Sequence, residues 1–175
     1  MTGRAAQKAE SIKLVALDVD GVMTDGRVIY ASDGSEQKSF NIKDGLGIKL
    51  LQRAGIKVAI ITGRHSAMVE RRAAELDISD VVMGREDKLQ ATLELIGPMS
   101  IELAEVAYMG DDLPDLSAIM QCGHGACPAD AVLPVRQAAD WVSSTPGGYG
   151  AIREWAEAML QARGQWENFM VSFQK

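Results

Sequence analysis

The chain has 175 residues and a formal net charge of −6, with 47% hydrophobic and 24% charged residues. This length suggests one domain with a single core. The acidic balance argues against generic binding to nucleic acid or to an anionic membrane surface. No apolar run is long enough to span a bilayer, residues 1–11 lack the apolar stretch of a secretory signal, and two cysteines make no disulfide framework. The simplest compartment is therefore a reducing cytoplasm.

Apolar runs and turn residues predict strands that alternate with helices along the chain. After a loose lead-in over residues 1–11, a strand over 12–18 precedes a β-hairpin over 27–42 that turns at Asp33-Gly34. A helix then begins near residue 43, carries Leu46, Leu50 and Leu51 on one face, and ends at Gly55. Further strands are expected at 57–61, 80–83, 105–109, 123–127 and 141–143, and further helices at 66–76, 86–96, 113–121, 131–139 and 150–163.

This alternation implies βαβ units and therefore a mostly parallel sheet with helices on both faces. Such α/β folds place their functional residues at the carboxyl ends of the strands. The first strand ends on Asp18 and Asp20, one residue apart and followed by Gly21. Two carboxylates that crowd one point repel each other unless a cation compensates, and Mg²⁺ prefers oxygen ligands of this kind.

Three further segments carry chemistry at predicted strand ends or helix starts. Thr62, before Gly63, offers a hydroxyl to a phosphate, and Lys88 offers an ammonium. Alone, each is better explained as a plain turn or a solvated helix start. The segment from Gly110 to Asp115 holds three carboxylates in five residues, of which helix capping explains only one.

Taken in order, these segments resemble the four motifs of the haloacid dehalogenase (HAD) phosphohydrolase superfamily, whose first motif is DxDGxxT and fourth is GDDxxD. The resemblance implies a Rossmann-like core and a Mg²⁺-dependent phosphatase reaction through an aspartyl-phosphate. Asp18 would be the nucleophile and Asp20 the general acid and base, while Thr62 and Lys88 hold the phosphoryl group. The implied metal ligands are Asp18, the backbone carbonyl of Asp20, and Asp111, supported by Asp112 and Asp115.

Between the first and second motifs there is only a hairpin and one helix, which leaves no room for a cap domain. The chain resembles the capless, tetrameric 3-deoxy-D-manno-octulosonate 8-phosphate (KDO 8-phosphate) phosphatases, most specifically in residues 40–45 and 147–154. The resemblance implies a homotetramer, a role in lipopolysaccharide biosynthesis, and a sugar acid phosphate as substrate. The implied substrate-binding residues, partly from a neighbouring subunit, are Asp20, Asn41, Ile42, Lys43, Asp44, Gly45, Lys49, Arg64, Arg72 and Lys88.

Lys43 and Lys49 stand where that family commonly has arginine, and lysine lacks the bidentate fork of arginine. An alternative hypothesis is therefore that the chain is a phosphatase of a 9-phosphorylated nonulosonate. More remote alternatives are a phospho-accepting receiver domain and a non-catalytic HAD-like subunit.

The remaining features divide the chain into a phosphatase domain over residues 12–163 and a tail over 164–175. Cys122, His124 and Cys127 offer only three ligands in a spacing that fits no common zinc finger, so two thiols near the core and a loop histidine are the preferred interpretation. The aromatic tail is expected either to dock on a neighbouring subunit or to fray.

Overall fold

The central feature is a six-stranded sheet, seen in a computed structural model that describes residues 8–174. All its strand pairs are parallel, in the order β5-β4-β1-β6-β7-β8. Its strands are β1 (Leu14–Leu17), β4 (Lys57–Thr62), β5 (Asp80–Met83), β6 (Val106–Met109), β7 (His124–Cys127) and β8 (Trp141–Val142). The predicted parallel α/β fold is confirmed.

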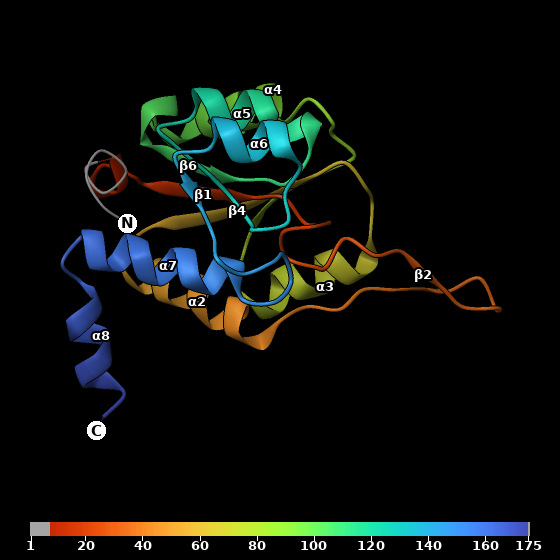
Figure 1. The fold of residues 1–175 in the computed structure, drawn as a ribbon, viewed down its shortest axis with the longest axis horizontal. Coiled ribbons are helices and arrows are strands. Elements are labelled where there is room, and N and C mark those ends of the chain that lie inside the picture. Colours follow the sequence, from red (N-terminus) through yellow and green to blue (C-terminus); the bar gives the residue numbers. More distant parts are fainter. Residues whose placement is uncertain (1–7, 175) are drawn as a thin grey trace.

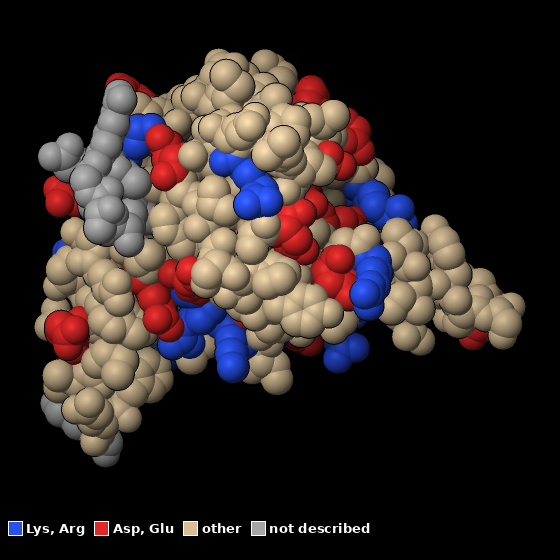
Figure 2. Space-filling model, in the orientation of Figure 1, with Lys and Arg blue, Asp and Glu red and all other residues tan. Residues whose placement is uncertain are grey.

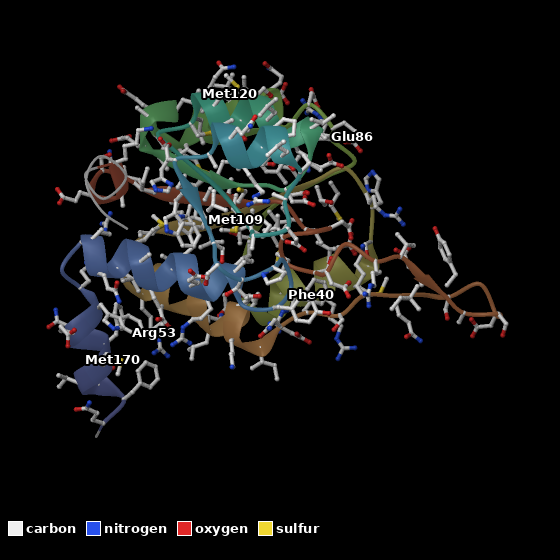
Figure 3. All side chains as sticks on the ribbon, in the orientation of Figure 1. Phe40, Arg53, Glu86, Met109, Met120 and Met170 are labelled. Atoms are coloured by element: carbon white, nitrogen blue, oxygen red, sulfur yellow. The ribbon has the colours of Figure 1, made fainter. Side chains whose placement is uncertain are left out.

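Helices cover both faces of the sheet (Figure 1), as the alternation of strands and helices predicts. One face carries α2 (Ile42–Arg53), α3 (Ala67–Glu75) and α7 (Ala151–Ala162), and the other carries α4 (Lys88–Ile96), α5 (Leu116–Gln121) and α6 (Leu133–Ala138). Single 3₁₀ turns lie at η1 (Gly97–Met99), η2 (Leu103–Glu105) and η3 (Leu113–Asp115). Each face has its own buried apolar cluster, and Met109 of β6 lies in the layer between the helices (Figure 3).

The hairpin is confirmed as a separate antiparallel pair, β2 (Ile29–Tyr30) and β3 (Glu36–Gln37). It projects from the edge of the sheet where the parallel strands end (Figure 1). Its strands are exposed, with Tyr30 69% exposed. An isolated two-stranded hairpin is marginally stable, so this arm depends on contacts at its root or on another molecule.

On the predicted apolar face of α2, Leu50 and Leu51 are buried, whereas Leu46 is 36% exposed. The buried face of α2 runs through Gly47, Ile48 and Leu51. A Cβ on Gly47 would lie 2.9 Å from the Cα of Arg153, so the missing side chain lets α7 approach closely and sets the orientation of α2.

The tail contains a helix that the sequence analysis did not predict, α8 (Trp166–Ser172). Trp166 and Phe169 pack against the α2–α7 side of the core, so the apolar tail residues are ordered by the body of the chain. Within the described residues, no helix is long and apolar enough to cross a membrane.

Candidate active site

A pocket of about 280 Å³ lies where β1, β4 and β6 end. The chain crosses from one side of β1 to the other between β5 and β6, so the site sits at the switch point expected for an open α/β sheet. Acidic and basic side chains gather beside the root of the hairpin on the face shown in Figure 2. The lining residues are Asp18, Asp20, Gly26, Thr62, Gly63, Arg64, Glu86, Lys88, Asp111, Asp112, Pro114 and Asp115.

An almost fully buried ion pair forms the floor of this pocket. Asp18 follows β1 directly, and its backbone N–H donates to Met109 O at 3.0 Å, which extends the β1–β6 ladder by one residue. Lys88, the first residue of α4, donates its Nζ to Asp18 Oδ1 at 2.6 Å and to Ile61 O at 2.9 Å. The Lys88 side chain is only 3% exposed, so its charge depends on these partners.

Three carboxylates converge next to this lysine. One oxygen from each of Asp18, Asp111 and Asp115 lies within 4.8 Å of the others. Asp115 is held by Tyr108, whose hydroxyl donates to Oδ1 at 2.7 Å, and by the N–H of Asp111, which donates to Oδ2 at 3.1 Å. If all three carboxylates are ionised, Lys88 leaves the cluster with two uncompensated negative charges, which a divalent cation would neutralise.

The pKa values of two of these carboxylates agree with a cation-binding role for the cluster. Burial, followed by the charge of Asp115, raises the pKa of Asp18 to about 7, while Lys88 opposes the increase. Burial, followed by the charges of Asp18 and Asp115, raises the pKa of Asp111 to about 8. These oxygens therefore fit Mg²⁺, which takes a few carboxylates together with phosphate and water.

The loop after Asp18 needs glycine for a steric reason. The N–H groups of Val22, Met23 and Thr24 all donate to Val19 O, which curls the chain tightly. Gly21 has a φ of +90°, and a Cβ on it would lie 2.0 Å from an oxygen of Asp111. Only glycine allows the first and fourth motifs to approach so closely.

Asp20 lies at the mouth of the pocket among charged side chains from the hairpin and from the loop after β4. It forms an ion pair with Lys38, and Arg64 Nε lies 3.9 Å from Asp20 Oδ2. Lys38 is not among the predicted site residues, because nothing in its spacing shows that the hairpin root returns to the first motif. Nor is Glu86, which lines the pocket from the loop after β5 (Figure 3).

The predicted substrate loop, residues 41–45, lies outside this pocket, and its side chains bind the backbone at the start of α7. Asn41 accepts from Lys43 N at the start of α2 and donates from Nδ2 to Gly148 O at 3.2 Å. The buried carboxylate of Asp44 accepts from Arg153 N at 2.8 Å and from Gly150 N at 3.2 Å, which caps α7. Burial raises the pKa of Asp44, and these backbone donors oppose the increase.

The other predicted substrate residues divide between the two edges of the sheet. Arg64 lines the pocket. Arg72 belongs to α3, lies over the ring of Phe40, which is labelled in Figure 3, and donates to Asn41 O at 3.3 Å. Lys49 pairs with Asp77 in a separate hollow of about 760 Å³, which Lys57 and Asp80 line at the opposite, amino-terminal edge. That larger hollow does not contain the carboxylate cluster.

Three more of the predicted substrate residues belong to the first turn of α2, namely Ile42, Lys43 and Gly45. Ile42 is 84% exposed, and Gly45 faces Arg72.

Asp112 has a local structural role, because its carboxylate accepts from Leu113 N at 2.8 Å and caps the turn that follows. Cys122, His124 and Cys127 do not converge. The prediction of a loop histidine is wrong, because His124 is buried in β7, where its ring packs near Trp155 with ring centroids 5.8 Å apart. Cys122 and Cys127 belong to the apolar cluster on the other face of the sheet. Burial raises the pKa of Cys122 to about 12 and lowers that of His124 to about 4.

Comparison with known proteins gives close matches over nearly the whole chain, although no protein-family model matches it. The 3-deoxy-D-manno-octulosonate 8-phosphate phosphatase of Haemophilus influenzae is 45% identical over 159 residues, covering 91% of this chain and 88% of the relative. The chain belongs to the 3-deoxy-D-manno-octulosonate 8-phosphate phosphatase family.

Solved structures agree with this family membership. The enzyme from Moraxella catarrhalis, in complex with magnesium, phosphate and KDO, has a TM-score of 0.97 and 45% identity, covering 99% of each chain. A HAD superfamily (subfamily III A) hydrolase from Legionella pneumophila has a TM-score of 0.93 and 40% identity, covering 98% of this chain and 94% of the other. The receiver-domain and non-catalytic alternatives are therefore not favoured, and the chain is a phosphatase of the HAD superfamily.

Proposed function

We propose that this protein is a Mg²⁺-dependent phosphomonoesterase that hydrolyses KDO 8-phosphate to KDO and phosphate. The observation that carries the proposal is the buried cluster of Asp18, Lys88, Asp111 and Asp115 at the switch point, in a chain of this family. The M. catarrhalis relative, described in complex with magnesium, phosphate and KDO, supports both the cation and the sugar acid.

In the first half of the reaction, a carboxylate oxygen of Asp18 attacks phosphorus while the bond from phosphorus to the sugar oxygen breaks. Asp20 gives its proton to the departing sugar oxygen. Lys88 offsets negative charge on the nucleophile and on the phosphoryl group, and the Thr62 hydroxyl, which accepts from Arg64 N at 3.4 Å, keeps its hydrogen for a phosphoryl oxygen.

In the second half, Asp20 takes a proton from water, whose oxygen attacks phosphorus and releases phosphate from Asp18. Mg²⁺, held by Asp18, Asp111 and the Asp20 carbonyl with Asp112 and Asp115 in support, would neutralise charge between the anionic nucleophile and the anionic phosphate. We therefore propose the same metal ligands and catalytic residues that the motifs predict.

Substrate recognition is proposed to involve a second subunit. Arg64 lines the pocket, whereas Asn41 to Gly45, Lys49 and Arg72 lie outside it, so these residues would reach a substrate only in a neighbour's site. The exposed apolar side chains of Val28, Ile29 and Tyr30 on the projecting hairpin support association, for which we propose a homotetramer. A cytoplasmic location and a role in lipopolysaccharide biosynthesis follow from the proposed substrate.

The test is Mg²⁺-dependent phosphate release from KDO 8-phosphate, from a 9-phosphorylated nonulosonate and from glucose 6-phosphate. We expect a strong preference for KDO 8-phosphate, and loss of activity on Asp18→Asn or in EDTA. Preference for the nonulosonate would replace the substrate, and equal turnover of all three esters would leave only a general phosphatase. Light scattering after size-exclusion chromatography measures the number of subunits, and a monomer would contradict the shared site.

A further inference from the structure

We propose that Lys38 is the residue that positions Asp20 and stabilises its charge during proton transfer, an inference that rests on the proposed function. Lys38 follows β3 at the root of the hairpin, and its Nζ forms an ion pair with Asp20 Oδ1. The Lys38 side chain is only 1% exposed, whereas that of Asp20 is 23% exposed. A buried ammonium of this kind needs a hydrogen-bond acceptor, which Asp20 Oδ1 supplies whether or not Oδ2 carries a proton, so the contact constrains both residues.

The two oxygens of Asp20 have different surroundings. Oδ1 is engaged by Lys38, while Arg64 Nε lies 3.9 Å from Oδ2 and therefore beyond hydrogen-bond distance. Oδ2 is consequently the oxygen left to carry the transferred proton. The Lys38 contact would hold the carboxyl group in one orientation, with Oδ2 available at the mouth of the pocket.

Other charges do not replace Lys38. Glu36 Oε1 lies 3.8 Å from Lys38 Nζ and accepts from Arg64 at 3.0 Å, so Arg64 is divided between Glu36 and Asp20. The Arg64 side chain is 43% exposed, and solvent weakens its effect on Asp20. Lys38 is therefore the desolvated cation at this carboxylate, and it ties the hairpin root to the catalytic loop.

The chemistry gives such a cation a specific effect. When the Oδ2 proton moves to the sugar oxygen, the bond from phosphorus to that oxygen breaks and Asp20 becomes a carboxylate. Negative charge thus develops beside the Lys38 ammonium, where a fixed cation lowers the energy of the transition state. This help matters for an alkyl ester, whose leaving oxygen needs a proton, and matters little for a nitrophenyl ester, whose leaving group departs as a stable anion.

The experiment compares kcat and KM for KDO 8-phosphate and for p-nitrophenyl phosphate in the wild type, Lys38→Met and Lys38→Arg. We expect Lys38→Met to lower kcat/KM for KDO 8-phosphate, which covers the steps up to formation of the aspartyl-phosphate, by roughly 10²-fold, the lower range for general acid catalysis, and to change kcat/KM for the nitrophenyl ester less than about threefold. Lys38→Arg should restore part of the lost activity. Lys13→Met is the control, because Lys13 pairs with Glu105 outside the pocket.

Equal losses on the two esters would overturn the proposal, because a merely structural lysine affects both. An unchanged kcat/KM for KDO 8-phosphate would also overturn it. Thermal unfolding of each variant separates misfolding from a catalytic effect. If the wild type does not hydrolyse KDO 8-phosphate, the substrate proposal fails, and the same comparison is made with the alkyl phosphate that the wild type hydrolyses fastest.

Discussion

Removing the charge of Lys88 should destabilise the protein far more than removing the charge of its partner. In Lys88→Met, a side chain of similar length leaves Asp18 buried beside Asp111 and Asp115 without its cation. Breaking a buried pair in this way costs about 3–5 kcal/mol. In Asp18→Asn, by contrast, Lys88 Nζ still donates to Ile61 O at 2.9 Å and still lies 3.8 Å from Asp115 Oδ1. The substitution also removes one of the crowded negative charges. Asp18→Asn should therefore change stability little, or increase it.

The assay is urea unfolding in EDTA at pH 7.5 for the wild type, both single variants and the double variant. Because Asp18→Asn removes the unpaired charge that Lys88→Met creates, the double variant should be more stable than Lys88→Met alone, with a coupling energy of about 2 kcal/mol. A Lys88→Met cost below about 1 kcal/mol would refute the reasoning, as would additive effects, because the buried pair would then not control this part of the fold.

Three further outcomes follow from the same geometry. Burial raises the pKa of Asp111 from its ordinary value of 3.8 to about 8, so in EDTA the folded protein should lose stability as the pH rises from about 4 to 8. Asp111→Asn should flatten this dependence of Tm on pH, and parallel curves for the two proteins would contradict it. Gly147→Ala should lower Tm and activity, because the added Cβ would lie 1.8 Å from Gly21 O. Gly97→Ala is the control and should lower neither, because no neighbouring atom lies within 4 Å of the added Cβ. Equal effects of the two substitutions would contradict this packing. Tyr108→Phe should destabilise the protein by about 1–3 kcal/mol in urea unfolding, because Asp115 loses a buried donor, and a cost near zero would show that this hydrogen bond is replaceable.

The fold was predictable because local patterns and the global arrangement agree. A short run of consecutive apolar residues, such as residues 14–17, points both faces of a strand into apolar surroundings and therefore predicts a strand covered on both sides. The helical segments between such strands form crossover connections, which make the strands parallel. The catalytic cluster was predictable for the same reason. Asp18, Thr62 and Asp111 each follow or end a strand, so parallel pairing brings them to one edge without any further information.

Lys38 could not be predicted, because its position depends on how the hairpin leaves the first motif and returns. That path rests on turns in residues 19–26 and 31–35, which the spacing of apolar residues does not specify. Helix α8 was missed because a seven-residue helix has little stability of its own, and Trp166 and Phe169 order it only through contacts with α2 and α7.

The family-specific segments at 40–45 and 147–154 have a physical role that their sequence did not reveal. Asn41 and Asp44 bind the backbone of Gly148, Gly150 and Arg153, so the two segments pack against each other. Gly147 in turn packs against the Gly21 carbonyl. Changes in residues 40–45 can therefore move the catalytic loop without touching substrate, and a loss of activity in an Asn41 or Asp44 variant would not by itself show substrate contact.

The open, acidic pocket also explains why stability and function depend on the same cation. Burial, together with the excess negative charge of three carboxylates beside one lysine, raises the pKa of Asp18 and Asp111 and favours their protonated forms. A divalent cation held there would lower that cost and favour the ionised nucleophile. Replacing all the charged residues of the cluster together by hydrophobic residues would avoid this cost but remove both the metal site and the nucleophile, so the cost is inseparable from the chemistry.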